Sequence, residues 1–313
     1  MKGLELSEQF YQTHGRPMLQ TQFPELAGLI AVGLLGSGSE CFGYDDALST
    51  DHDFEPGFCI LLPDEDLVDR KTAFALERAY SKLPKEFMGY RRNALDPVGG
   101  NRHGVIRMQE FLQDKTGTPD GILSPMQFFF VPEQSLLEVT GGRIFYDGLG
   151  AITDIRTQLA YLPEDVRRKK LAGNLLLMGQ SGQYNYKRSI DRGESGAAQL
   201  AIFEFVKSAI HTICLINRAY LPYYKWSFRA VRSLPRLSML APTLEHLISS
   251  PNGATKVSEK LAAVEQIAKE IIGAVGADGL SSYAGTALEG CAYAVNDSIS
   301  DPEIRNLHIL YGV

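Results

Sequence analysis

Cysteine, histidine and tryptophan are scarce in this sequence, and none of them is clustered. The 313 residues contain four cysteines, six histidines and one tryptophan. The cysteines form no Cys-x-x-Cys pair, which argues against a cysteine zinc site or a disulfide scaffold and predicts buried, reduced thiols in a cytoplasmic protein. The chain also lacks the His-Glu-x-x-His motif of zinc peptidases and the Gly-x-Ser-x-Gly motif of serine hydrolases. The cysteines are Cys41, Cys59, Cys214 and Cys291.

Long apolar runs and an excess of positive charge are absent as well. No stretch approaches the roughly 18 to 20 apolar residues that span a bilayer. No apolar run follows Lys2, so neither a membrane span nor a signal peptide is expected. The net charge is -6, and an acidic chain is a poor default partner for long nucleic acid. Because 44% of the residues are apolar and 22% are charged, the composition is that of a globular protein with a sizeable core.

Hydrophobic patterning predicts strands and helices in the first half of the chain. Short apolar or alternating segments bounded by glycine or proline predict strands at residues 30–35, 57–62, 103–111 and 141–148. Helical periodicity predicts a helix at 64–83, which Asp64 would cap, and two short helices within 125–140.

Beyond residue 150 the pattern is helical. Helices are predicted at 154–161, 163–192, 195–220 and 254–275. The segment 195–220 is apolar on more than one face, which predicts the central helix of a bundle. We therefore predict an α+β fold, with a mixed sheet and helices in residues 1–150 and a helical bundle domain in residues 151–313.

The segment most informative about chemistry combines a Gly-Ser loop with two aspartates. Leu35-Gly-Ser-Gly-Ser39 follows the first predicted strand, and a helix starting there would present free N–H groups and serine hydroxyls to phosphates. Asp51 and Asp53 would project to one face of a strand, where a divalent cation would relieve their repulsion. The plainer alternative is a turn followed by capping aspartates. The loop lacks the Gly-Lys-Ser ending of a P-loop.

This arrangement resembles the nucleotidyltransferase superfamily, which includes DNA polymerase beta, kanamycin nucleotidyltransferase and the minimal nucleotidyltransferases. The signature is an apolar residue, Gly-Ser, about a dozen residues and then Asp-x-Asp, and both Leu35-Gly-Ser37 and Asp51-His-Asp53 fit it. His52 departs from the apolar residue usual at that position. The chain also looks like an uncharacterised bacterial branch of this superfamily over about residues 5–230. The further matching strings are 132–137, 142–147, 185–188 with Arg192, and 217–222 with Lys225 and Trp226.

The resemblance implies transfer of a nucleoside monophosphate from a nucleoside triphosphate to an acceptor hydroxyl, with release of pyrophosphate. AMP is the nucleotide expected from the superfamily. The resemblance also implies that Gly36, Ser37, Gly38 and Ser39 hold the triphosphate, ATP being the expected one, and that Asp51 and Asp53 hold Mg²⁺ or Mn²⁺. Many members add a third carboxylate from the next strand, as a metal ligand or a base for the acceptor's proton. Glu110 is the expected residue here, with Asp147 and Glu194 as alternatives. Asp45 and Asp46 are expected to cap a helix or to be solvated.

The helical half offers a second, weaker set of basic residues. Arg188 and Arg192 are four residues apart, so they would share a helix face and could clamp phosphate. The alternative is a solvated face paired with Asp191 and Glu194. Lys225 could contact the nucleotide beside Trp226, for which packing is the simpler explanation.

Two classes of function remain open at this point. The first is an active, metal-dependent nucleotidyltransferase whose acceptor is a small molecule, a protein or an RNA end. The second is a non-catalytic nucleotide-binding regulatory or partner-binding protein. Neither requires a membrane, and either is compatible with an oligomer.

Overall fold

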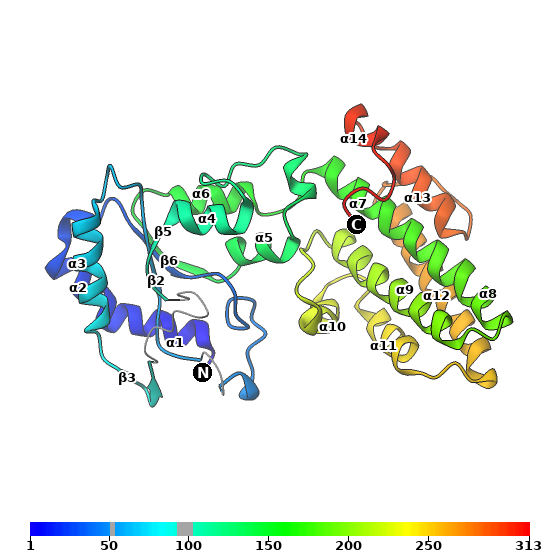
Figure 1. Ribbon diagram of the computed structural model, residues 1–313, viewed down its shortest axis with the longest axis horizontal. Coiled ribbons are helices and arrows are strands. Elements are labelled where there is room, and N and C mark those ends of the chain that lie inside the picture. The colour runs from blue at the N-terminus through cyan, green and yellow to red at the C-terminus, as the bar shows by residue number, and fades with distance from the viewer. Residues whose placement is uncertain (51–53, 93–102) are drawn as a thin grey trace. The chain divides into compact units, whose positions relative to one another are not determined.

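The computed structural model describes residues 1–50, 54–92 and 103–313. They form two compact units, which we call the sheet unit and the helical unit (Figure 1). The sheet unit comprises Met1–Leu123 and Val131–Ala160, and the helical unit comprises Ser124–Phe130 and Tyr161–Val313. The predicted α+β fold is confirmed, because the described residues contain a mixed sheet with helices followed by a helical region.

The main sheet brings together four segments that are far apart in the sequence. Its strands are β1 (Ala31–Leu34), β2 (Cys59–Leu62), β5 (Gly104–Arg107) and β6 (Arg143–Asp147). The order across the sheet is β5-β2-β1-β6. β1 is antiparallel to β2 and β6, whereas β2 and β5 are parallel. Every residue of β1 and β2 is buried, as continuous apolar runs predict. A separate hairpin pairs β3 (Glu86–Phe87) with β4 (Tyr90–Arg91).

Helices cover both faces of this sheet. One face carries α1 (Gly3–Phe10), the π-helix η1 (Tyr11–Gly15), α2 (Arg16–Gln22) and α3 (Arg70–Ser81). Figure 1 shows α4 (Met108–Thr116), α5 (Glu133–Thr140) and α6 (Ala151–Gln158) on the side away from α2 and α3. Phe10, Leu19 and Leu76 form one core cluster with Val32 and Ile60, so burial of apolar side chains holds the first helical layer on the sheet. Short 3₁₀ helices occur at Pro24–Leu26, Ala47–Thr50, Gln127–Phe129 and Ser238–Leu240.

The structure corrects two sequence predictions in the sheet unit. The helix predicted from Asp64 begins at Arg70, because the Asp69 carboxylate accepts the Thr72 N–H at 2.8 Å and caps α3. The strand predicted at 103–111 ends at Arg107, and Met108 begins α4. Methionine, glutamine, glutamate and leucine favour helix, so only the first half of that segment behaves as a strand.

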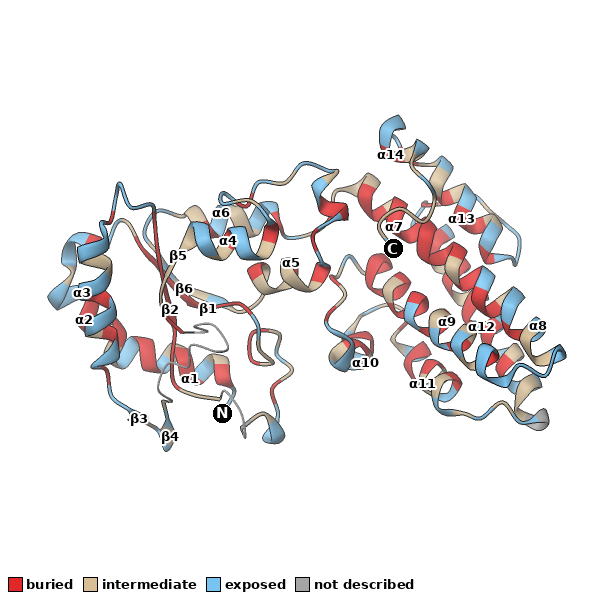
Figure 2. Ribbon diagram, viewed as in Figure 1, coloured by how far each residue is buried: buried red, intermediate tan, exposed pale blue. Residues whose placement is uncertain are grey.

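The helical unit is a bundle with α9 (Ser195–Ile216) at its centre. α9 packs against α7 (Glu164–Met178), α8 (Tyr186–Asp191), α11 (Ala241–Ser249) and α12 (Ala254–Ala277). Figure 2 shows buried residues along α7, α9 and α12. This confirms the predicted central helix. The remaining elements are the π-helix η5 (Gly179–Asn185), α10 (Tyr224–Ser233), α13 (Leu288–Asp297) and α14 (Pro302–Asn306).

The apolar length of α9 corrects a further expectation. Among the described residues α9 is the one helix long and apolar enough to cross a membrane by length and composition. Of its most apolar window, 61% is buried. The core helix of a bundle has the same length and composition, because it must be apolar on several faces.

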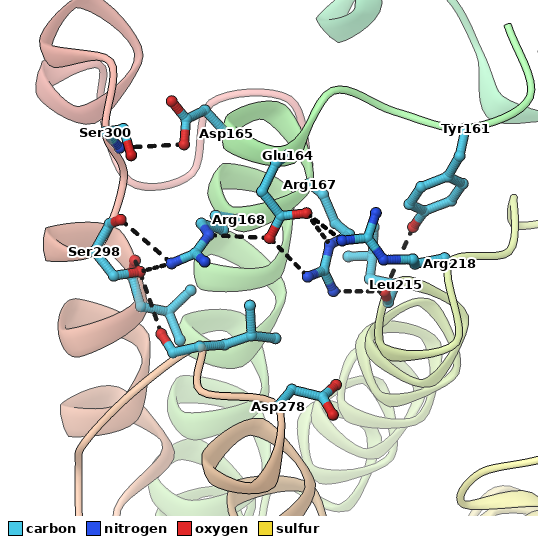
Figure 3. Close-up of polar contacts among 12 residues, drawn as sticks. Tyr161, Glu164, Asp165, Arg167, Arg168, Leu215, Arg218, Asp278, Ser298 and Ser300 are labelled. Carbon is cyan, nitrogen blue, oxygen red and sulfur yellow. Dashed lines mark hydrogen bonds and ion pairs between the residues drawn. The ribbon is translucent and has the colours of Figure 1, made fainter.

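Polar contacts link the start of α7 to the segment that follows α9 and to the segment that precedes α14 (Figure 3). Glu164 accepts bonds from Arg167, Arg168 and Arg218, at 2.8, 3.1 and 2.6 Å. Burial alone would raise the pKa of Glu164, but these guanidinium groups outweigh burial and lower it. Asp165 accepts the N–H groups of the two residues that precede α14 (Figure 3).

Two fully buried lysines act as hydrogen-bond donors inside the helical unit. Lys169 Nζ donates to Asn296 Oδ1 at 2.8 Å and to the carbonyl oxygens of Arg305 and Leu307. Lys260 Nζ likewise donates to the Ser250 carbonyl and to two side-chain amide oxygens. Burial lowers the pKa of both amines. Each ammonium therefore satisfies carbonyl groups that helix packing leaves without a backbone partner.

Candidate functional site

The Gly-Ser loop lies where the C-terminal end of β1 meets the N-terminal ends of two other strands of the main sheet. Gly36–Ser39 follow β1, and the register pairs Gly33 of β1 with Cys59 of β2 and Cys59 with Gly104 of β5. The loop that follows β1 therefore lies at the same end of the strands as the residues that precede β2 and β5. Asp51, His52 and Asp53 lie outside the described residues.

The Gly-Ser loop forms turns rather than the start of a helix. Gly36 (φ +97°) and Gly38 (φ +138°) adopt backbone conformations that other residues rarely reach. The Gly36 N–H donates to the Glu138 carbonyl at 3.0 Å, and the Gly142 N–H donates to the Cys41 carbonyl at 2.7 Å. The loop is therefore anchored to the end of α5 and the start of β6.

Two backbone donors of this loop are not used within the described part of the chain. Neither the Gly38 N–H nor the Ser39 N–H has an acceptor among the described residues. Their carbonyls do have partners, since Gly38 O accepts from Cys41 N–H and Ser39 O accepts from Tyr44 N–H at 2.7 Å. Both residues are half-buried. Adjacent unpaired N–H groups are a recurrent means of holding an anion.

Asp45 and Asp46, which follow this loop, bind backbone N–H groups at the starts of helical segments, as was expected of these two residues. Asp45 is buried, accepts the Gly3 N–H at 2.9 Å and pairs with Lys2 at 3.4 Å, so it holds the start of α1. Asp46 accepts the Leu48 N–H at 3.0 Å in the following 3₁₀ turn.

The three carboxylates considered as a third ligand lie in different settings. Glu110 is exposed in the first turn of α4, not on a strand. Asp147 accepts the Gly150 N–H at 2.9 Å and both donors of Thr153, so it caps α6. Glu194 is exposed just before α9. In the described part of the chain, no three Asp, Glu, His or Cys residues are grouped so that they could hold a metal ion.

A carboxylate–imidazole pair at the same end of the strands as the Gly-Ser loop was not identified from the sequence. His103 Nδ1 lies 3.0 Å from Glu55 Oε1, and both side chains are largely buried. Gly57 makes room for the ring, because a Cβ there would lie 2.6 Å from His103 Cγ. The available signal was a histidine directly before a strand that starts with glycine, which is weak without knowledge of strand pairing.

The basic residues singled out in the second half all lie in the helical unit. Arg188 Nη1 donates to the Tyr184 hydroxyl at 2.7 Å, and its guanidinium lies 4.7 Å from that ring's centroid. Asp191 pairs with Lys187 at 2.7 Å rather than with either arginine. Arg192 follows α8 and is exposed.

The remaining basic residue of that set lies on a different helix. Lys225 Nζ of α10 lies 4.3 Å from the centroid of the Trp226 ring. Arg188 and Arg192 thus lie together at α8, whereas Lys225 lies apart from them in the sequence.

Comparisons with known proteins give two matches. A family model described as a domain of unknown function, DUF4037, matches residues 128–227. No curated protein matches the chain. Among solved structures, the chain is similar to the crystal structure of a nucleotidyltransferase-like protein from Exiguobacterium sibiricum 255-15, with a TM-score of 0.38 and 13% identity. That match covers 84% of this chain and 77% of the other.

Proposed function

We propose that this chain is a metal-dependent nucleotidyltransferase that moves AMP from ATP to an acceptor hydroxyl and releases pyrophosphate. The observation that carries the proposal is the Gly-Ser loop: a buried strand leads into turns that leave the N–H groups of Gly38 and Ser39 without acceptors among the described residues. The Asp-x-Asp sequence that follows at the superfamily spacing supports the same conclusion.

In this proposal the loop binds the triphosphate. The two N–H groups donate to phosphate oxygens, and the exposed Ser37 lies beside them. The bond between Gly36 and Glu138 keeps the loop in one conformation, so little ordering cost remains when the nucleotide binds. Asp51 and Asp53 would hold Mg²⁺, which would neutralise the charge that develops on the transferred phosphate.

The direct test is transfer of a radiolabelled α-phosphate into fractions of a cell extract. We expect Mg²⁺-dependent labelling of an acceptor together with release of pyrophosphate. Asp51→Asn and Asp53→Asn should abolish labelling while the circular dichroism spectrum is unchanged. Asp66→Asn is the matched control, because Asp66 is an exposed aspartate in the turn before α3. Full turnover in both active-site variants would refute the proposal.

The alternative is a non-catalytic nucleotide-binding protein. Glu110 favours this alternative, because it is exposed on a helix and does not lie on the strand where the third carboxylate was expected. Titration calorimetry with ATP and Mg²⁺, followed by a pyrophosphate assay, separates the two. Tight binding without pyrophosphate release in any fraction would favour the alternative.

A further inference from the structure

A pocket in the sheet unit lies apart from the Gly-Ser loop. Its volume is about 300 Å³, and it is lined by η1, α2, the segment that leads into β1, and β6. Ala27 and Ile30 of its lining precede β1, whereas the Gly-Ser loop follows β1. The four residues of β1 extend over roughly 13 Å. This part of the pocket therefore lies toward the opposite end of β1 from the Gly-Ser loop. A volume near 300 Å³ is at the small end of the range for ligand pockets.

Two independent backbone irregularities meet at this pocket. The first is the π-helix η1, whose Tyr11 and Gln12 line it. The second is a β-bulge, because Val32 pairs with Tyr146 and Gly33 pairs with Ile144. Phe145 is therefore the extra residue. Single π-helical turns and β-bulges both occur often at functional sites, because each redirects a side chain at some cost in regular hydrogen bonding.

The bulge explains why two successive strand residues line the same pocket. In a regular strand Phe145 and Tyr146 would point to opposite faces, yet both contribute to the lining. The Phe145 ring is stacked on Tyr11, with centroids 5.8 Å apart and planes 20° apart. The Tyr146 hydroxyl donates to the Ala27 carbonyl, which fixes the ring at the rim. The pocket thus has flat aromatic walls.

The pocket also has a single, uncompensated charge. Of the described residues that line it, Arg16 is the only charged one. Its guanidinium donates to the neutral Gln12 Oε1 at 3.3 Å and has no ion pair with any described residue. Burial raises the pKa of Tyr11, so that hydroxyl stays protonated and leaves the charge of Arg16 unbalanced. A guanidinium without a carboxylate partner favours an anionic group on a ligand.

We propose that this pocket binds a small planar aromatic compound that carries one anionic group. The ring packs against Phe145 and Tyr146, and the anion accepts hydrogen bonds from Arg16. The aromatic walls provide dispersion and apolar burial, and the charge-assisted bond fixes the ligand's orientation. The proposal does not depend on nucleotide transfer, since no residue of the Gly-Ser loop lines the pocket.

The test uses 1-naphthoate as the probe and titration calorimetry on the full chain. We expect saturable binding of 1-naphthoate and much weaker binding of the neutral 1-naphthalenemethanol. Arg16→Gln should weaken naphthoate binding by about tenfold or more, because it removes one charge-assisted hydrogen bond. Arg78→Gln is the matched control, since Arg78 is an exposed arginine of α3 that does not line the pocket. It should bind as the parent chain does.

Three results would overturn the proposal. One is the absence of binding to the parent chain at millimolar probe. Another is equal affinity of Arg16→Gln and the parent chain for naphthoate. The third is equal affinity for the acid and the alcohol. Arg16 is exposed, so its substitution should leave the fold intact, and a thermal melt of each variant verifies this.

Discussion

Gly142 should be one of the least replaceable residues of the sheet unit, because two separate constraints act on it. Its φ is +67°, a value that costs an alanine about 1 kcal/mol. A Cβ at this position would also overlap the carbonyl oxygen of Leu34 and crowd the Leu35 backbone. Backbone atoms cannot rotate away as a side chain can, so β1 and β6 would have to separate locally. Overpacking of this kind adds about 2 kcal/mol.

A second glycine provides the control for this substitution. Gly150 has φ +74°, close to that of Gly142, but a Cβ there would meet no atom within 4 Å. Gly150→Ala should therefore cost only the conformational term of about 1 kcal/mol, and Gly142→Ala about 3 kcal/mol. The difference isolates the steric overlap with Leu34, because the backbone strain is nearly the same at both sites.

Hydrogen exchange read by mass spectrometry is the suitable assay. This assay reports on individual segments of the sheet unit, whereas Trp226, the chain's only tryptophan, belongs to the helical unit. Amides of β1 should exchange about 30-fold faster in Gly142→Ala than in Gly150→Ala, which corresponds to about 2 kcal/mol. Under the proposed function, Gly142→Ala should also weaken ATP binding, because the Gly142 N–H holds Cys41 beside the Gly-Ser loop. Equal exchange rates in the two variants would refute the steric argument.

Three further predictions concern burial and capping. Lys169→Met should lower the free energy of unfolding of the helical unit, measured with urea, by about 3 kcal/mol, because three oxygens lose the buried amine that donates to them. The exposed Lys71→Met should change it little. Asp69→Ala should lower the melting temperature more than Asp66→Ala, because Asp69 caps α3. Hydrogen bonds from Thr72 hold the pKa of Asp69 below its usual value. The stabilisation from this cap is therefore fully present at a pH above the usual pKa of an aspartate, and it is lost as the pH falls through the lower pKa of the folded state. Burial raises the pKa of Cys291 to about 11, so its thiolate forms only near that pH, and a colorimetric thiol reagent at pH 8 should label it only after denaturant is added.

Local sequence was sufficient to predict much of the secondary structure. The apolar runs that became β1 and β2, the turn-bounded strand β6 and the central helix α9 all followed from periodicity and from glycine and proline positions. The α+β order followed from the same local signals. The Gly-Ser loop was found in the same way, since a glycine-rich break after a buried strand can be read from one segment.

Pairing across the chain decided what local signals could not. The sequence predicted Asp64 as the cap of a helix, but α3 begins at Arg70 and the Asp69 side chain caps it. No helix was predicted in residues 1–25, and α1 is held partly by Asp45, which lies more than forty positions away. Strand register placed Glu55 beside His103 and created the bulge at Phe145.

The sequence by itself thus determined β1, β2, β6 and α9, together with the Gly-Ser loop and the Asp-x-Asp spacing, because these depend on residues that are close together in the chain. Tertiary structure alone decided that the loop's carbonyls are used while the N–H groups of Gly38 and Ser39 have no acceptor among the described residues. It also decided that the pocket around Arg16 exists, because the π-helix and the β-bulge that line it lie far apart in the sequence. Hydrogen-bond satisfaction and strand register depend on distant partners, and no local pattern encodes them.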